Sequence, residues 1–526
     1  MQRSFALTLA ALLLSGIAHQ EAPGAVFQYR VSVATEKSPS EAFCWIPAKV
    51  ERIGGVVVGG MTLMEREMAR DAVIRKACAD EGLAILFLKC GLLKCDLQKV
   101  LDDFARLSGY EELRSAPLMF VGHSAGGPQA RTLATKLATR CFGLVQYRGG
   151  GPGSLGPGVP ALMMLGQFDE FGGAMRRRDG RETWEGGRDQ MAGYRAKDTG
   201  NLGSVVVEPG AGHFAWSDRN AKYLALFIRK AARARIGAKG YKLKRIDYRK
   251  GWLGDMAIKT AGKFPPAPYD KYKGDKTSAA WYFDEEIALA TKAYHAGGFG
   301  KKDQFIKWND PYWVDAGTRF FFTKLKWVGD GRTLRVHPEY AKAYPKQYKG
   351  RGPRWLDAGK SVGCSSAPIR IKPVSGPVVA LGSDTFRMRF DGLAPAGTRA
   401  RVTFMAFSEG DGDYRYTEIV GMMPRGFGGL KKGKAQTITF PPIGNLKSDS
   451  PAVELKATSD SGLPVEYYVA CGPAVITDGK LKIRQLPRRA KYPIEVKVVA
   501  WQFGSGVEPL VRTAEPVAQT IRIDKR

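Results

Sequence analysis

The alternation of strand-like and helix-like segments over residues 26–235 constrains the fold of this chain more than any other feature. Buried-strand patterns occur in "RIGGVVVGG", "LAILFLKC", "PLMFVG", "CFGLVQYRGG", "PALMMLGQFDE" and "SVVVEPG". Helical spacing of apolar residues occurs between and after them, in "LMEREMARDAVIRKACADEG", "LQKVLDDFARLSGYEEL", "GGPQARTLATKLATR" and "AKYLALFIRKAARARIG". Strands joined through helices pair in parallel, and parallel sheets are buried on both faces. We therefore expect an α/β fold with a mostly parallel sheet and helices on both faces.

The pattern changes after residue 235. Residues 236–300 form a basic, aromatic-rich connector in which "DEEIALATKAYHAGG" is the expected helix. Farther along, short alternating runs such as "TFRMRFDGL" and "ARVTFMAFSE" are punctuated by Gly, Pro, Asp and Ser, as in all-β sandwiches. With 526 residues the chain is too long for one ordinary domain. We expect an α/β domain at 26–235, a β-sandwich domain at 301–434 and a second β domain at 435–526.

The N-terminus has the pattern of a secretory signal peptide. Arg3 precedes an apolar run from Phe5 to Leu14, and Gly16 and Ala18 occupy positions −3 and −1 of a cut after Ala18. We therefore expect residues 1–18 to be removed and the mature protein to be periplasmic or extracellular. No later apolar run of about 18 residues predicts a transmembrane segment.

Charge and cysteine content limit the classes of partner and cofactor. The formal net charge of +30 favours encounter with an anionic polymer surface. The basic residues are spread along the chain without a nucleic-acid-binding motif, so we expect no specific nucleic-acid partner. Seven cysteines are too few for a disulfide-dense scaffold. Cys90 and Cys95 could form a small loop disulfide, but four intervening residues and no neighbouring His disfavour a zinc site.

The sequence Gly122-His123-Ser124-Ala125-Gly126 fits the pattern G-x-S-x-G and lies between an expected strand and an expected helix. This context is the one in which a strained turn projects a serine hydroxyl as a nucleophile. Glycines are needed there because side chains would collide with the backbone. We therefore predict that Ser124 is a catalytic nucleophile. The alternative is a buried turn serine on an inactive scaffold.

A serine nucleophile needs a histidine base and a carboxylate that orients it. Of the five histidines, His213 follows the last expected strand on a glycine-rich loop, just before the closing helix. Asp169 lies in the loop after "PALMMLG" and is the first choice for the acid. Glu170 is the fallback, and Glu208 is a distant third.

The remaining predicted site residues bind the reacting group or the substrate. The backbone N–H of Ala125 and one from Gly60 or Met61 are the expected oxyanion-hole donors. Arg148 follows the strand "CFGLVQY" and could bind an acidic substrate group through bidentate contacts. Residues 176–178, in the basic segment before His213, could do the same. For these arginines a solvated surface role remains the main alternative.

Residues 26–235 resemble the α/β-hydrolase superfamily, in particular its dienelactone hydrolase-like and esterase branch. The motifs "VVVGGMT", "GHSAGG", "LGQFDE" and "PGAGHF" carry this resemblance, in that order. It implies hydrolysis of a carboxylic ester through an acyl-enzyme intermediate, without metal or organic cofactor. Dienelactone hydrolases use a cysteine nucleophile where this chain has Ser124, so their substrate does not follow from the resemblance. The segment from residue 436, with its "ATSDSGLPV" and "GPA" turns, resembles bacterial immunoglobulin-like repeats, which implies a non-catalytic spacer.

These patterns lead us to expect an exported serine esterase. By analogy with exported esterases that carry β-rich domains, its substrate would be a carbohydrate-linked ester. Polyesters or small-molecule esters are alternatives, as is a non-catalytic adhesion protein with an inactive hydrolase domain. Aromatic residues that could stack on sugar rings, or equally fill sandwich cores, are Trp281, Tyr282, Phe283, Trp308, Tyr312, Trp313 and Trp327.

Overall fold

A computed structural model describes most of the chain after its first 26 residues. The described ranges are 27–60, 63–150, 158–169, 183–237, 241–308, 313–314, 322–323, 326–344, 359–398, 401–422 and 428–526. The predicted signal peptide at 1–18 therefore lies outside them, as do Met61, Glu170 and residues 176–178. In the described part, no helix is long and apolar enough to cross a membrane.

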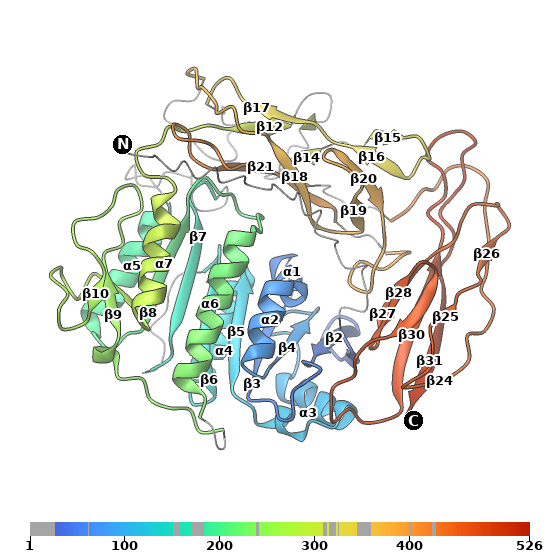
Figure 1. Ribbon diagram of the computed structural model, residues 1–526, viewed down its shortest axis with the longest axis horizontal. Coiled ribbons are helices and arrows are strands. Elements are labelled where there is room, and N and C mark those ends of the chain that lie inside the picture. Colours follow the sequence, from blue (N-terminus) through green and yellow to red (C-terminus); the bar gives the residue numbers. More distant parts are fainter. Residues whose placement is uncertain are drawn as a thin grey trace, which may run out of the picture.

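The N-terminal region is built on a mostly parallel eight-stranded sheet (Figure 1). Strands β3 to β8 pair in parallel, whereas β1 and β2 form an antiparallel edge beside β4. All six of these parallel strands are buried along their whole length, or all but one residue, which explains their mostly apolar sequences. In spatial order the strands are β1 (Tyr29–Val33), β2 (Ser40–Trp45), β4 (Leu83–Leu88), β3 (Gly55–Gly60), β5 (Leu118–His123), β6 (Cys141–Tyr147), β7 (Ala161–Gly166) and β8 (Gly203–Glu208).

Helices cover both faces of this sheet, as the sequence predicts. Buried side chains of α2, α5 and α6 share one core with one face, and those of α3 and α4 share another core with the opposite face. The observed arrangement confirms the expected α/β fold. The helices are α1 (Leu63–Arg70), α2 (Ala72–Asp80), α3 (Leu97–Ser108), α4 (Gly126–Lys136), α5 (Thr183–Lys197) and α6 (Asp218–Arg235).

Two details of this helical layer differ from the sequence-based expectation. The single helix expected after β3 is broken at Asp71, whose carboxylate accepts hydrogen bonds from the N–H groups of Val73 and Ile74 and so starts α2. The sequence does not predict helix α5, because this segment is polar and has little amphipathic pattern. Burial of Trp184 and Met191 against the sheet supplies the tertiary contacts that hold it.

The connector at 236–300 extends the α/β layer beyond β8. It contains a small sheet of β9 (Trp252–Gly254), β10 (Ala267–Pro268) and β11 (Ala280–Tyr282), followed by the expected helix α7 (Glu285–Ala296). Asp284 caps α7 by accepting a hydrogen bond from the N–H of Ile287. Both β11 and α7 pack against β8. The connector is therefore part of the same folded body.

The region 301–434 contains two main sheets that enclose a common core. Leu334 and Phe386 come from one sheet and Phe404 and Ala406 from the other, and all four are fully buried. One sheet has the order β13 (Trp313–Val314), β14 (Phe322–Thr323), β22 (Thr417–Met422), β21 (Thr403–Ser408) and β18 (Arg370–Ser375). The other has the order β15 (Lys326–Val328), β16 (Thr333–Arg335), β20 (Thr385–Met388) and β19 (Val378–Ala380). A two-stranded pair adds β12 (Ile306–Trp308) and β17 (Pro338–Tyr340).

The region 435–526 is also all-β. Its largest sheet has the order β24 (Leu446–Lys447), β31 (Val517–Asp524), β30 (Ile494–Trp501) and β27 (Glu466–Cys471). The smaller sheets comprise β25 (Val453–Glu454), β29 (Lys480–Ile483) and β28 (Ala474–Thr477), and the pair β23 (Ile438–Thr439) and β26 (Thr458–Ser459). The likeness to immunoglobulin-like repeats stays a prediction.

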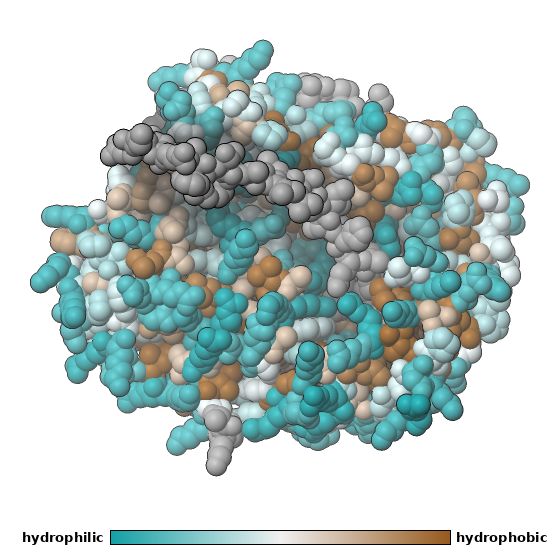
Figure 2. All heavy atoms as spheres, in the orientation of Figure 1, coloured by the Kyte–Doolittle hydropathy of each residue, from teal (hydrophilic) through white to brown (hydrophobic). Residues whose placement is uncertain are grey.

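The β regions pack closely on the α/β domain (Figure 1). Val374, Met405 and Val420 belong to the same buried cluster as α2 and α6. At the opposite edge, the N–H of Gly472 donates to the carbonyl oxygen of Phe27 over 3.2 Å. The outer face in Figure 2 is mostly hydrophilic, with apolar residues scattered over it. The described parts of the three regions therefore share buried surface.

Candidate active site

Ser124 lies in the sharp turn between β5 and α4. Its φ angle is +53°, in the left-handed region that non-glycine residues adopt only where the surroundings hold them there. The turn is so tight that a methyl group on Gly122 would overlap the carbonyl oxygen of Gly126, and one on Gly149 would overlap that of Ser124. The Ser124 side chain is partly exposed although both preceding residues are buried. The turn thus presents the hydroxyl at the end of a buried strand.

Asp169 and His213 meet at the ends of the two neighbouring strands β7 and β8. Nδ1 of His213 lies 2.9 Å from Oδ1 and 2.8 Å from Oδ2 of Asp169, and both residues are buried. A carboxylate accepts the Nδ1–H and selects the tautomer in which Nε2 carries the lone pair. The histidine can therefore accept a proton at Nε2.

The residue before the serine holds the histidine loop. His123 Nε2 donates a hydrogen bond to the carbonyl oxygen of His213 over 3.0 Å, and the two rings lie 4.9 Å apart. Burial, and then the nearby His213, hold the pKa of His123 well below its usual value. His123 is therefore neutral and serves as a fixed donor that brings the His213 loop to the Ser124 turn.

Two of the predicted oxyanion donors, Ala125 and Gly60, belong to backbone segments near this turn. Ala125 is exposed and is the N-cap residue of α4, and Gly60 ends the neighbouring strand β3. A methyl group on Gly126 would lie 3.6 Å from the carbonyl oxygen of Gly60, so the two backbones are close. Met61, the alternative to Gly60, lies outside the described residues.

Glu65 on α1 stabilises the Ser124 turn through a hydrogen bond to its backbone, a role that the sequence analysis did not predict. Its Oε1 accepts a hydrogen bond from the backbone N–H of His123 over 2.8 Å, and the side chain is buried. A methyl group on Gly126 would overlap this oxygen. Nothing in "LMEREMAR" distinguishes this glutamate from the solvent-exposed glutamates typical of helices, so no sequence signal could have found it.

Arg148, predicted to bind substrate, lies in a buried ion network. Its guanidinium pairs with Glu208, lies 3.6 Å from Oε1 of Glu418 and stacks 4.8 Å from the ring centroid of Tyr147. The residue is 2% exposed and has a φ of +48°. Binding a substrate carboxylate would require breaking these buried ion pairs, so we assign Arg148 a structural role.

Glu208, the third candidate for the triad acid, is occupied elsewhere. Its oxygens accept hydrogen bonds from Ser217 over 2.8 Å, Arg219 over 3.1 Å and Asn220 over 2.6 Å, besides the pair with Arg148. Burial opposes ionisation, but these cations and donors prevail and lower its pKa. Glu208 therefore stays ionised within the network, and Asp169 is the carboxylate at Nδ1 of His213.

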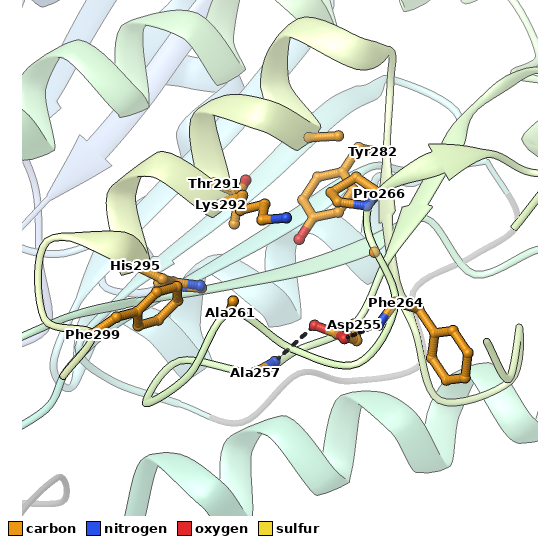
Figure 3. Close-up of a pocket in the computed structure, with 12 residues that line it drawn as sticks. Asp255, Ala257, Ala261, Phe264, Pro266, Tyr282, Thr291, Lys292, His295 and Phe299 are labelled. Carbon is orange, nitrogen blue, oxygen red and sulfur yellow. Dashed lines mark hydrogen bonds between the residues drawn. The ribbon is translucent and has the colours of Figure 1, made fainter. Parts of the chain in front are cut away.

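His295, on α7, lies in a pocket that is separate from this site. Figure 3 shows it beside Lys292 and Phe299, in a pocket lined only by residues between 254 and 299. Its Nε2 accepts a hydrogen bond from the N–H of Val207 over 3.0 Å, and burial lowers its pKa to about 4. Asp255 in the same pocket accepts backbone hydrogen bonds from Ala257 and Phe264. The hydrogen bonds of His295 and Asp255 thus hold the backbone around this pocket.

Two further observations limit what the described residues can bind. No group of three or more His, Cys, Asp or Glu side chains among them could hold a metal ion. Trp281, Tyr282 and Trp308 are no more than 3% exposed and so fill cores, which excludes them as sugar-stacking surfaces.

Comparison with known proteins gives likeness of structure only. No family model and no curated protein matches the sequence. One similar solved structure is the esterase domain of a Rhodothermus marinus protein, at 11% identity and a TM-score of 0.29, covering 40% of this chain and 99% of that one. Another is an α/β serine hydrolase homologue from Coxiella burnetii, at 13% identity and 0.28, covering 39% and 97%. A dienelactone hydrolase from Anabaena variabilis matches at 16% identity and 0.26, covering 40% and 98%.

Proposed function

We propose that this protein is a serine hydrolase that cleaves carboxylic esters through an acyl-enzyme intermediate. The observation that carries this proposal is the buried pairing of Asp169 with Nδ1 of His213, held by a hydrogen bond to the turn that projects Ser124. The positive φ of Ser124 supports it, because such strain is concentrated at functional turns.

In the proposed mechanism, Oγ of Ser124 attacks the ester carbonyl carbon while Nε2 of His213 takes the hydroxyl proton. Asp169 stabilises the imidazolium, and the N–H groups of Ala125 and of Gly60 or Met61 bind the oxyanion. The imidazolium then protonates the leaving alkoxide, and the alcohol departs. A water molecule, deprotonated by the same imidazole, attacks the acyl-enzyme and releases the acid and the free Ser124.

The substrate and the location are proposed in finer detail from the sequence. The N-terminal signal pattern supports export, to the periplasm or beyond the cell. A carbohydrate-linked ester remains the proposed substrate by analogy, with polyester and small-molecule esters as alternatives. Since Trp281, Tyr282 and Trp308 are buried, sugar recognition would have to use other side chains.

Labelling with a fluorophosphonate probe tests the nucleophile. We expect the wild-type protein to be labelled, and Ser124→Ala and His213→Ala to be unlabelled. Asp169→Asn should label at least 1000-fold more slowly, because an amide favours the wrong imidazole tautomer; the same change in another serine hydrolase costs about 10⁴-fold in kcat. Ser115→Ala, at an exposed serine, is the matched control and should label normally.

A folded wild-type protein that stays unlabelled would contradict the proposal and favour a binding role. If labelling succeeds, hydrolysis of p-nitrophenyl esters of increasing acyl length, acetylated oligosaccharides and a soluble polyester then distinguishes the substrate classes. A preference for the acetylated oligosaccharides would support the carbohydrate-linked ester.

A further inference from the structure

We propose that Glu418, on strand β22 of the sandwich region, is a positioning residue for the His213 loop, so that the active site is completed from outside the α/β domain. This inference rests on the proposed function. Oε1 of Glu418 accepts a hydrogen bond from the backbone N–H of Gly212 over 2.9 Å. Gly212 directly precedes His213, and the Glu418 side chain is 0% exposed.

Three hydrogen bonds hold the backbone around His213, and we call them tethers. The bond from the N–H of Gly212 to Glu418 is one of them. The carbonyl oxygen of His213 accepts from His123, and that of Ala215 accepts from the hydroxyl of Tyr147 over 2.5 Å. These two donors stand on β5 and β6 of the central sheet. Glu418 supplies the tether on the N-terminal side of His213 and so holds that end of the loop in position relative to the sheet.

Glu418 is itself held in place. The hydroxyl of Tyr416 donates to its Oε2 over 2.5 Å, and Nη1 of Arg148 lies 3.6 Å from its Oε1. Burial, and then the negative charge of Glu208, raise its pKa to about 7, while Arg148 opposes this. Oε1 can accept the Gly212 hydrogen bond when Glu418 is ionised, and also when the proton is on Oε2. The other ionisable groups of this network are Tyr147, Arg219 and Tyr294.

The residues directly before β22 also contact the loop that carries Asp169, the proposed acid of the triad. The guanidinium of Arg415 lies 4.2 Å from the ring centroid of Phe168, the residue before Asp169. The carbonyl oxygen of Tyr416 lies so close to Gly210 that a methyl group there would overlap it. Contacts from residues 415–418 thus fall on both triad loops, which distinguishes them from an ordinary interdomain interface.

Three variants test this role in the full-length protein. Glu418→Ala removes the acceptor for Gly212. Glu418→Gln keeps a carbonyl oxygen at that position. Glu409→Gln makes the matched change at an exposed glutamate of the same region. For each, we would measure the rate constant of fluorophosphonate labelling, the fraction finally labelled, and kcat and KM for p-nitrophenyl acetate.

We expect Glu418→Ala to lower the labelling rate constant and kcat at least tenfold, with little change in KM or in the labelled fraction. A displaced general base slows chemistry in every molecule, whereas misfolding removes molecules from the active pool. Glu418→Gln should restore most of the loss, and Glu409→Gln should match the wild type.

The outcomes separate this inference from the proposed function. An unlabelled wild-type protein would overturn the proposed function itself. Normal labelling of the wild type together with a wild-type rate constant in Glu418→Ala would overturn only the positioning role. A reduced labelled fraction with an unchanged rate constant would show that Glu418 supports folding alone, and would also overturn it.

Discussion

At the scale of single residues, the site depends on the absence of side chains around Ser124. The turn brings the backbones of β5, α4 and the loop after β6 into direct contact. Gly122 and Gly149 allow this approach because neither carries a Cβ atom. The strained φ of Ser124 persists because these surrounding contacts leave the turn little room to relax.

Adding a methyl group at Gly122 should therefore damage both stability and activity. Its Cβ would overlap the carbonyl oxygen of Gly126, which is backbone and cannot swing aside. We expect Gly122→Ala to lower the free energy of unfolding by about 1–3 kcal/mol and to slow fluorophosphonate labelling. Urea denaturation and labelling kinetics measure the two effects.

Gly193→Ala is the control, because a Cβ at this position in α5 meets nothing within 4 Å. It should be neutral or stabilising, since alanine favours helix. Equal stability losses in both variants would contradict the steric explanation.

The buried Glu418 should make stability depend on pH. Its pKa in the folded protein is raised to about 7, whereas in the unfolded chain it lies near 4.3. The folded state therefore binds the extra proton between these values, and stability falls as pH rises through this window. Glu418→Gln cannot titrate, so its stability relative to the wild type should improve from pH 5 to pH 8.

Urea denaturation of both proteins at the two pH values measures this difference. His123 and His295, whose pKa values are lowered, act in the opposite direction, but they are present in both proteins and cancel. A difference that is the same at pH 5 and pH 8 would contradict a raised pKa for Glu418.

At the scale of elements, the strands were predictable and some helix boundaries were not. Strands β3 to β8 are buried on both faces, so their apolar runs stand out in the sequence. The break at Asp71 lies inside an unbroken apolar period, and only the capping geometry reveals it. Helix α5 is held by contacts of Trp184 and Met191 that its local sequence does not encode.

Removing the cap at Asp71 should destabilise α2. The carboxylate accepts from the N–H groups of Val73 and Ile74, and Oδ2 also accepts from the indole of Trp216 near the His213 loop. We expect Asp71→Ala to lower the free energy of unfolding by about 0.5–2 kcal/mol. Asp71→Ser keeps a capping oxygen and should recover part of it. Thermal unfolding measures both, and identical losses would show that the cap is not the cause.

The same contrast applies to the site. Ser124, Asp169 and His213 each come soon after the end of a parallel strand, so their positions in the sequence predict that they meet. Glu65 and Glu418 carry no such local signal. Glu418 reaches Gly212 across 206 residues, and only the packing of the sandwich on the α/β domain brings the two together.

At the scale of the whole molecule, both β regions share buried clusters with the α/β domain. Val374, Met405 and Val420 from the sandwich lie in the core that includes α2 and α6. Asp391 of the sandwich pairs with Arg70 on α1 over 2.9 Å. Separating the regions would expose this shared core to water, which is unfavourable in proportion to the apolar area exposed.

We therefore expect a single unfolding transition. Calorimetry should give one endotherm, and tryptophan fluorescence and far-UV circular dichroism should report the same midpoint. Two separated transitions, or probes with different midpoints, would contradict a shared core.

The hydrogen bond from Gly212 to Glu418 can form only after the ribosome has synthesised both residues, which lie 206 positions apart in the sequence. Ribosomes add roughly 5 to 20 residues per second, so the 206 residues from His213 to Glu418 take roughly 10 to 40 s to synthesise. During that interval the nascent chain already contains Ser124, Asp169 and His213 but not the carboxylate that secures the histidine loop. The chain thus acquires the last tether of its reactive centre only late in translation.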